Sequence, residues 1–479
     1  MKKEWIKCVS LAASFFLLSV CGGKQGFKET PVKPGEDWMG IYVRDQKIGY
    51  VYSRQDMKGS NYTFTQKSTM KLEMLGSIET FATTLKASTD SKLDLKDFSF
   101  DISSRQNSFF AQGKRIGDKI RINIETSGRK ETREIDAKGS LLISPALGHW
   151  VLSQSPKPGD KLQVDIFEPT LLRVIPVSVK AISFDTLLID GKEVPALHLE
   201  TRMMNLSSEV WLDSSGISIK ELQQPGIVMM RESREKALEI ESNVEKLDLL
   251  SFFAVRPDSL ITNPRTIKEL VIRIEGLTAA DSLSIASSTQ KVKYRENGVE
   301  FCISSPDTSK VSRTDIPLTE PSEFLSSSVY IQSGDPEIKN KASEIVGDER
   351  DVMAASRKLV LWVYKNLRKR ATASVPSAVE VLHTLEGDCN EHAILLAALA
   401  RSEGIPAKIN VGLVYLDGAF YYHAWNSLYI GGAWLPVDAT FGQIPSDPTH
   451  IQLHEGELDE QAKVLSVVGK LKISVISYK

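Results

Sequence analysis

Hydrophobic and polar residues alternate along much of the first half of the chain. Ile120, Ile122 and Ile124 are each separated by one polar residue, and Phe98 and Phe100 follow the same rule. A period of two places alternate side chains on one face of a strand, so this pattern predicts antiparallel strands with one buried face. We expect a β-rich domain of long hairpins over residues 38–248, built either as one curved sheet or as a sandwich.

The pattern changes twice in the second half of the chain. Residues 249–335 contain further strand-like stretches, TIKELVIRIEGL at 266–277 and the residues around Cys302, which predict a second, smaller β segment. Beyond residue 335, apolar residues recur at three- and four-residue spacing, which is typical of amphipathic helices. The predicted fold class is therefore α+β and multidomain, with a last domain over residues 336–479.

The N-terminus has the features of an export signal. Basic residues in MKKEWIK precede an apolar run at 8–20, which is shorter than the roughly 20 residues that a membrane-spanning helix needs. The sequence LSVC at 18–21 resembles the bacterial lipobox. This resemblance implies a signal peptide over residues 1–21 and a lipid on Cys21. A polar tether over 22–37 would then hold the protein to a membrane of the cell envelope, facing the periplasm or the exterior.

Composition excludes some classes of function. The 479 residues include 59 Lys and Arg and 61 Asp and Glu, a formal net charge of −2. Without a basic excess, general nucleic-acid binding lacks its electrostatic basis, and we expect no nucleic-acid partner. Four cysteines and seven histidines are too few for a disulfide scaffold or for a rich set of metal clusters.

A cysteine stands at the predicted start of a buried helix. Asp388 is a preferred N-cap residue, and Glu391 three residues later completes a capping box. The helix predicted from Cys389 to about Ser402 is apolar almost all round. Unpaired N–H groups and the positive end of the helix dipole favour a thiolate at its first turn, as a nucleophilic cysteine requires.

Two hairpins follow this helix, with predicted turns at 417–418 and 431–432. If the second turn pairs Ile430 with Ala433, then His423 and Asp438 become diagonal neighbours on one face, within reach of each other. Across the first hairpin Gly412 falls opposite His423, which predicts open space beside that ring.

Four motifs in this region resemble a known family. GDCNEHA (387–393), GIPAK (404–408), HAW (423–425) and WLPVDATFGQ (434–443) resemble the transglutaminase-like domain of bacterial envelope proteins. The resemblance implies a papain-like fold with a Cys-His-Asp triad and no cofactor or metal. Cys389 would be the nucleophile, His423 the base and then the acid, and Asp438 the residue that orients the imidazole.

Other roles for these side chains compete with the triad. Cys389 and His392 lie at i and i+3, and with His423 and Asp438 they could be combined into a zinc site, although the paired ligand motifs typical of zinc are missing. The remaining C-terminal histidines lack a partner pattern and are expected at the surface or in incidental positions: His383, His450 and His454.

Two classes of function remain open from the sequence. The first is a thiol enzyme that forms an acyl-enzyme from a peptide or protein amide, such as that of a cell-wall peptide. It would act more in the manner of a peptidase or amidase than of a cross-linking enzyme. The second is a non-catalytic papain-like scaffold or binding module in the cell envelope. Loss of a triad member usually marks the second class, and all three candidates are present here.

Overall fold

The computed structural model describes residues 32–74, 77–103, 108–126, 129–204, 206–224, 226–239, 253–278, 281, 283–370 and 377–479. The predicted signal peptide, Cys21 and most of the predicted tether lie outside these residues. Within them, no helix is both long enough and apolar enough to cross a membrane.

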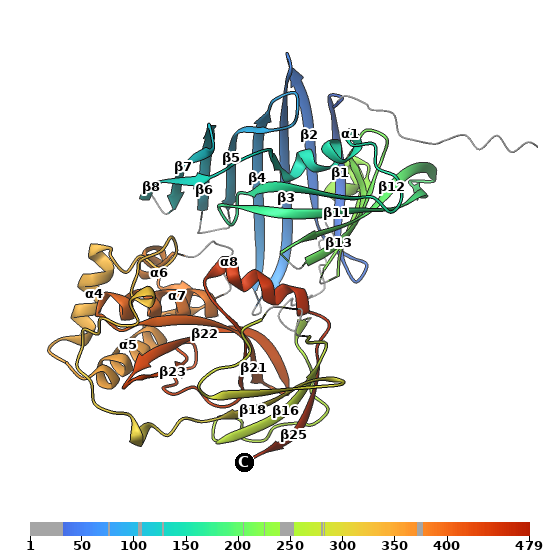
Figure 1. Cartoon of the computed structure of the whole chain (residues 1–479). Coiled ribbons are helices and arrows are strands. Elements are labelled where there is room, and N and C mark those ends of the chain that lie inside the picture. Colours follow the sequence, from blue (N-terminus) through green and yellow to red (C-terminus); the bar gives the residue numbers. More distant parts are fainter. Residues whose placement is uncertain are drawn as a thin grey trace, which may run out of the picture.

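A single large antiparallel sheet makes up the N-terminal half of the molecule (Figure 1). Its strands are β1 (Gly35–Val43), β2 (Gln46–Lys58), β3 (Asn61–Met74), β4 (Ser77–Thr89), β5 (Leu95–Ser103), β6 (Ser108–Ile116), β7 (Lys119–Thr126), β8 (Arg129–Asp136), β9 (Leu141–Ile143), β10 (Lys161–Glu168), β11 (Arg173–Ile189), β12 (Lys192–Met203), β13 (Leu206–Leu212), β14 (Ser218–Gln223) and β15 (Ile227–Glu232). The short helices η1 (Ser144–Ala146), α1 (Leu147–Ser153) and α2 (Arg234–Leu238) accompany it.

The sheet bends over on itself, which settles the choice between a curved sheet and a sandwich in favour of one curved sheet. Its order runs from β8 to β1, then from β15 to β9, and every pairing is antiparallel except β9 with β10. Phe98 of β5 packs against Phe167 of β10, with ring centroids 4.7 Å apart, although these strands are not neighbours in the sheet. The two halves of the sheet therefore face each other across a shared core.

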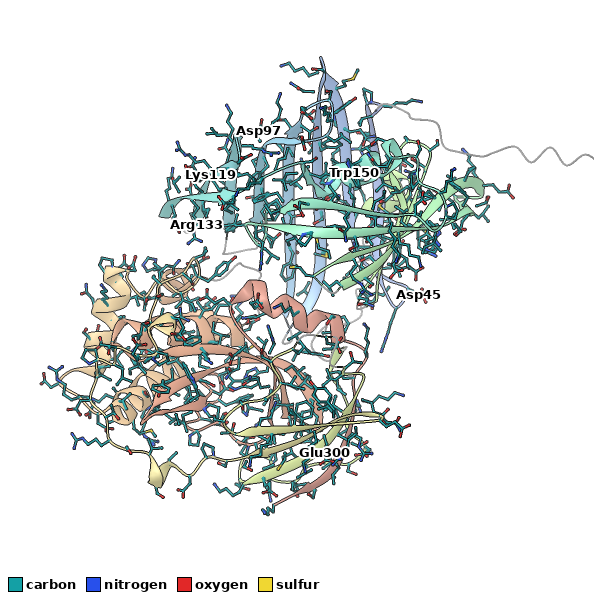
Figure 2. The ribbon with its side chains drawn as sticks, in the orientation of Figure 1. Asp45, Asp97, Lys119, Arg133, Trp150 and Glu300 are labelled. Atoms are coloured by element: carbon teal, nitrogen blue, oxygen red, sulfur yellow. The ribbon has the colours of Figure 1, made fainter. Side chains whose placement is uncertain are left out.

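The predicted alternation is confirmed on β7. Ile120, Ile122 and Ile124 are all buried, whereas Lys119 between the turn and the first isoleucine is exposed. Figure 2 shows exposed charged side chains such as Lys119 on this sheet, and Lys119 pairs with Glu134 of β8. The apolar face of β7 thus builds the core and its charged face meets solvent.

The C-terminal half combines three smaller sheets with helices. Its elements are β16 (Glu269–Glu275), β17 (Gln290–Arg295), β18 (Gly298–Ser304), η3 (Thr308–Lys310), η4 (Ser322–Phe324), α4 (Pro336–Val346), α5 (Val352–Asn366), β19 (Arg368–Lys369), α6 (Ala378–Thr384), β20 (Glu386–Gly387), α7 (Cys389–Ser402), β21 (Ala407–Leu416), β22 (Ala419–Ile430), β23 (Ala433–Val437), β24 (His450–Glu455), α8 (Leu458–Gln461), η5 (Ala462–Val467) and β25 (Lys472–Tyr478).

The predicted α+β multidomain fold class is confirmed: a large N-terminal antiparallel sheet is followed by smaller sheets and a C-terminal α+β region. One sheet has the order β17-β18-β16-β25, so the last strand of the chain joins the second β segment. A pair of two-residue strands, β19 and β20, leads into α7. The domain boundaries proposed from the sequence remain predictions.

The sheet that holds the candidate site has the order β23-β22-β21-β24, and α7 packs on it (Figure 1). Both hairpin registers are confirmed, because Leu416 pairs with Ala419 and Ile430 pairs with Ala433. Asn426 of β22 is fully buried and donates a hydrogen bond to the backbone oxygen of Ala393 in α7. This bond ties the strand that carries His423 to the helix that begins at Cys389.

The expected open space beside Gly412 is absent. Gly412 does pair with His423, as the register requires, but β24 lies along the other edge of β21. A Cβ atom on Gly412 would stand 1.9 Å from the backbone oxygen of Ile451. The glycine is there because two backbones approach closely, at a bulge in the β21–β24 ladder.

Replacement of Gly412 by Ala should therefore destabilise the protein by about 2–3 kcal/mol, since the added methyl group forces β24 away from β21. Thermal unfolding of the variant measures this loss. Gly35→Ala is the matched control, because a Cβ atom on Gly35 of β1 meets nothing within 4 Å. Equal stability of the two variants would contradict the close approach.

Candidate active site

Cys389 is the first residue of α7, and the local sequence explains its position. The side chain of Asp388 accepts a hydrogen bond from the N–H of Asn390, and the Glu391 side chain accepts one from the N–H of Asp388 at 2.8 Å. The predicted capping box is thus confirmed, as are the predicted bounds of the helix. Behind this first turn, the helix from Ala393 to Ala400 is buried, so the backbone at Cys389 is firmly anchored.

The structure brings His423 and Asp438 together. The Nε2 atom of His423 lies 2.8 Å from Oδ2 of Asp438, and the carboxylate is completely buried. Its other oxygen, Oδ1, accepts the backbone N–H groups of Thr440 at 2.6 Å and Phe441 at 3.2 Å. Since Asp438 accepts a hydrogen bond from the Nε2–H of His423, the lone pair of the imidazole lies on Nδ1 and is available for other chemistry.

The thiol of Cys389 lies beside the strand that carries the imidazole. The backbone amide of Ala424, the residue after His423, faces the sulfur and lowers its pKa. The structure contains no hydrogen bond between the sulfur and the His423 ring. Cys389 itself is half-buried, which leaves part of it accessible. Cys302 on β18 is also a free thiol, so the two cysteines of the described chain are not paired.

The surroundings of the Cys389 thiol raise its pKa, contrary to the expectation of a thiolate at the helix start. Burial is the largest cause that raises the pKa of Cys389 well above its ordinary value, and the charge of Asp388 raises it further. The nearby charges of Glu391 and Asp438 act in the same direction. The N-terminus of α7 alone therefore does not generate the nucleophile, and removal of the thiol proton requires a base.

His450 is a site residue that was wrongly expected at the surface or in an incidental position. Its side chain is 2% exposed, and its Nε2 lies 2.9 Å from the same Asp438 oxygen that holds His423. On its other side, Nδ1 lies 3.1 Å from the backbone oxygen of Asp447. The histidine is the first residue of β24, which pairs with β21 and not with β23, the strand that ends just before Asp438.

The charges around Asp438 are balanced within the protein. Burial alone raises the pKa of Asp438, but the charge and hydrogen bond of His423 and the contacts with His450 lower it far below its usual range. Burial alone lowers the pKa of His450, but its hydrogen bonds to Asp438 and Asp447 raise it to about 9. Asp447 in turn accepts a hydrogen bond from Arg265 at 2.8 Å.

The remaining histidines have other partners. His392 is fully buried, and its Nδ1 lies 2.6 Å from the backbone oxygen of Asp388, so it supports the first turn of α7. His454, expected at the surface or in an incidental position, is also buried and accepts the N–H of Ser284 at 2.9 Å. His383 contacts Glu337 near the surface.

The structure does not bring together the four residues that were combined into a possible zinc site from the sequence. In the described chain, the histidine and carboxylate atoms that converge belong to His423, Asp438 and His450, without His392. Their contacts at 2.8 and 2.9 Å are hydrogen-bond distances. Ligand atoms that share a tetrahedral zinc ion with bonds of about 2.0–2.2 Å lie roughly 3.4 Å apart, so the present spacing suits protons between these atoms.

Aromatic rings enclose the imidazole of His423. Trp425 stacks near it at 6.0 Å between centroids and 13° between planes, and Phe441 lies 5.4 Å away. Trp425 is 2% exposed, so it packs against the site and is not an open substrate platform. These rings exclude water from the His423–Asp438 hydrogen bond, which strengthens it.

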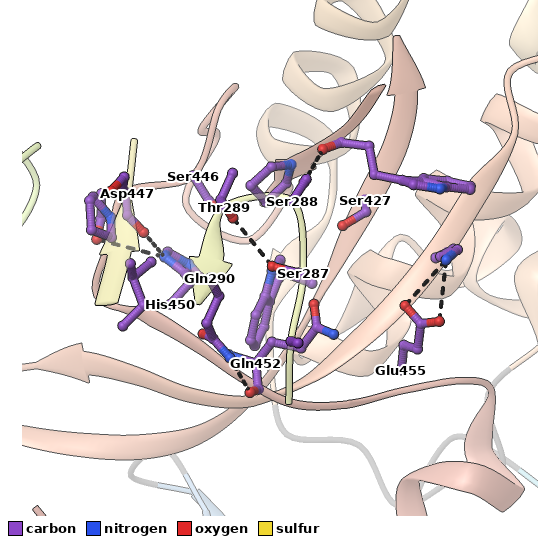
Figure 3. A pocket seen from close by; sticks show the side chains of 18 residues that line it. Ser287, Ser288, Thr289, Gln290, Ser427, Ser446, Asp447, His450, Gln452 and Glu455 are labelled. Carbon is purple, nitrogen blue, oxygen red and sulfur yellow. Dashed lines mark hydrogen bonds and ion pairs between the residues drawn. The ribbon is translucent and has the colours of Figure 1, made fainter. Parts of the chain in front are cut away.

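A polar hollow of about 180 Å³ adjoins this site from the side of His450 (Figure 3). Trp425, His450 and Asp447 contribute to its wall together with Gln290 and Gln452, but none of the three predicted triad residues does. Gln290 and Gln452 bond each other, since the Gln452 N–H donates to Oε1 of Gln290 at 2.9 Å. The second β segment therefore covers the back of the site.

A comparison with known protein families finds a match within the C-terminal α+β region. Residues 339–439 match the model of the transglutaminase-like superfamily. This range contains Cys389, His423 and Asp438 but ends before His450. No curated protein sequence matches the chain.

Several solved structures resemble the chain at low sequence identity. A proposed cysteine protease from Cytophaga hutchinsonii is 19% identical with a TM-score of 0.30, and the match covers 44% of this chain and 86% of that one. A proposed protease from Parabacteroides distasonis is 11% identical with a TM-score of 0.20, covering 72% and 69%. A β-barrel-like protein from Brucella abortus is 12% identical with a TM-score of 0.35, covering 42% and 96%.

The family match and the site geometry fall on the same residues. The helix of Cys389 and the hairpin of His423 both lie in the matched range, and Asp438 is its penultimate residue. Residues 339–439 of this chain form a transglutaminase-like superfamily domain.

Proposed function

We propose that the chain is a thiol enzyme that cleaves amide bonds of peptides through an acyl-enzyme on Cys389. The observation that carries this proposal is the orientation of His423. Asp438 holds its Nε2, so the lone pair of Nδ1 is available to a thiol anchored next to Ala424. A base is needed at this position because burial and the neighbouring carboxylates raise the pKa of the thiol.

The reaction follows from these three side chains. Nδ1 of His423 takes the thiol proton of Cys389 as the sulfur attacks the amide carbon, and the carbonyl oxygen becomes an oxyanion. The N–H of Cys389 at the start of α7 is the donor we assign to that oxyanion. When the C–N bond breaks, Nδ1 returns the proton to the leaving amine, and a thioester remains on the sulfur.

The second half of the reaction repeats the proton transfer with another nucleophile. Water gives up a proton to Nδ1, attacks the thioester and releases a carboxylic acid, and the sulfur leaves as a thiol after taking the proton back. An amine acceptor would produce a new amide by the same steps. We propose water as the acceptor, which makes the enzyme peptidase- or amidase-like.

The proposed setting is the cell envelope. Export is supported by the basic residues of MKKEWIK and by the apolar run at 8–20 that follows them. Lipid attachment at Cys21 is supported by the sequence LSVC. An exported enzyme of this kind meets peptides, cell-wall peptides and other envelope proteins, and one of these classes is the proposed substrate. Mass spectrometry of the mature N-terminus tests the anchor, and an unmodified start away from Cys21 would refute it.

Hydrolysis is tested with the purified full chain and a mixture of peptides that includes cell-wall stem peptides, with and without an added primary amine. We expect free carboxyl products in both conditions, and their loss in Cys389→Ala. Products that appear only as amine adducts would instead establish a cross-linking enzyme. Absence of both products, together with an unreactive Cys389, would refute enzymatic activity.

A non-catalytic scaffold is the second candidate, and one observation favours it. The pKa of the Cys389 thiol is raised by burial and by neighbouring carboxylates, which is the reverse of an activated cysteine. The complete His423–Asp438 pair argues against this candidate, because a scaffold has no need to orient a base with a buried carboxylate.

A further inference from the structure

A second histidine contacts the carboxylate that orients His423. His450 and His423 place their Nε2 atoms 2.9 and 2.8 Å from the same oxygen of Asp438. Both histidine side chains are nearly inaccessible, at 2% and 7% exposure, and Asp438 is at 0%. One buried carboxylate oxygen thus accepts two imidazole N–H groups.

His450 also has a partner on its far side. Its Nδ1 lies 3.1 Å from the backbone oxygen of Asp447 and 3.7 Å from that residue's carboxylate. Figure 3 shows His450 beside Asp447 where the chain enters β24. Because both ring nitrogens face acceptors, the ring satisfies both only when both nitrogens carry a proton, as in the imidazolium form.

Asp447, the second acceptor of His450, is bonded in turn to a residue of the second β segment. Asp447 lies 2.8 Å from the guanidinium of Arg265, and it also accepts hydrogen bonds from Gln443 and Thr449. The titratable and charged groups that face His450 or its partners are therefore Asp438, Asp447, His423 and Arg265. With His450 charged, two aspartates are balanced by one histidine and one arginine, which removes the cost of an uncompensated buried charge.

We propose that His450 is a positioning residue for the thiol chemistry: it holds Asp438 in place and adds a positive charge behind the His423–Asp438 pair. This inference rests on the proposed function. A positive charge here favours the thiolate of Cys389. Its contacts with Asp438 and Asp447 raise the pKa of His450 to about 9, so this charge is present across the neutral range.

The test measures the pH dependence of Cys389 alkylation by a neutral haloacetamide in the full chain and in His450→Gln. Glutamine keeps a donor for Asp438 but removes the charge. We expect the pH of half-maximal alkylation to rise by about one unit, which lowers the rate at neutral pH about tenfold. His454→Gln is the matched control, because His454 is equally buried on β24 but bonds Ser284 and Glu460.

Each outcome decides the question. An unshifted pH profile in His450→Gln with a reactive Cys389 would overturn the role of His450 and leave the proposed function intact. A uniformly lower rate with an unshifted profile would equally overturn it, since loss of structure alone has that effect. An unreactive Cys389 in the unsubstituted chain would overturn the proposed function and this inference with it.

Nitrogen NMR of the histidine rings in the unsubstituted chain provides a measurement that does not depend on the variant's folding. We expect both nitrogens of His450 to carry protons at pH 7 and to lose one only near pH 9. A neutral His450 ring at pH 7 would overturn the inference.

Discussion

Cys389→Ser is expected to lower kcat/KM for amide cleavage by at least about a thousandfold, because a serine hydroxyl is a far weaker nucleophile in a site built for a thiol. In the proposed mechanism, His423 accepts a proton from a thiol whose pKa is already raised by burial. A serine hydroxyl, which ionises much less readily, makes that transfer harder still. Steady-state kinetics on a cleaved peptide measure the loss.

Cys302→Ser is the control for this substitution. Cys302 is the other free thiol of the described chain, and it lies on β18, in a different sheet from the one that carries His423. Its replacement should leave kcat/KM unchanged within about twofold, the scatter typical of substitutions that do not touch the reacting groups. Equal losses in the two variants would show that neither thiol is the nucleophile.

Asp438→Asn is expected to lower kcat by about a thousandfold to ten-thousandfold, the range found when the orienting carboxylate of a triad is replaced. The physical reason lies in the hydrogen bonds of the side chain. Oδ1 accepts two backbone N–H groups, from Thr440 and Phe441, so the oxygen of an asparagine would take that position. Its NH₂ group would then point at the Nε2 atoms of His423 and His450.

Two donors cannot share a hydrogen bond, so His423 would move its proton from Nε2 to Nδ1. Nδ1 would no longer be a base for the thiol, although the fold and the substrate contacts remain. We expect kcat to fall and KM to change little. The control is Asp213→Asn, which changes a carboxylate that also accepts backbone N–H groups, but in the N-terminal half. Activity of Asp438→Asn within tenfold of the unsubstituted chain would contradict the assigned role.

The local parts of this site could be predicted from the sequence because short-range rules govern them. The capping box at 388–391 places Cys389 at the start of α7, and glycine turns fix the register of both hairpins. That register alone brings His423 and Asp438 onto one face. Each of these features depends on residues less than about twenty positions apart, where turn and helix chemistry leave few alternatives.

Long-range packing accounts for what the sequence left unpredicted. His450, Gln452 and His454 alternate on β24, which suggests a solvent-facing row, yet all three are buried. The second β segment covers them: Gln290 bonds Gln452, and Ser284 bonds His454 across roughly 170 positions of the chain. The sequence pattern of β24 alone cannot show that a distant segment of the chain packs over its polar face.

The space beside Gly412 was misjudged for the same reason. Its pairing with His423 follows from the hairpin, but β24 occupies the other edge of β21, and Ile451 fills the position that looked open. β24, the strand at this edge, begins at His450, after the loop that follows Asp438. Only the order of strands in the sheet, which local patterns do not encode, shows that a backbone lies against this glycine.

The most direct test of the thiol enzyme is the alkylation rate of each cysteine by a neutral haloacetamide, resolved by mass spectrometry, in the full chain and in His423→Ala. We expect Cys389 to react near neutral pH much faster than Cys302, and we expect loss of His423 to slow Cys389 at least about tenfold while Cys302 is unaffected. Equal, slow reaction at both cysteines, unchanged by the loss of His423, would contradict this expectation.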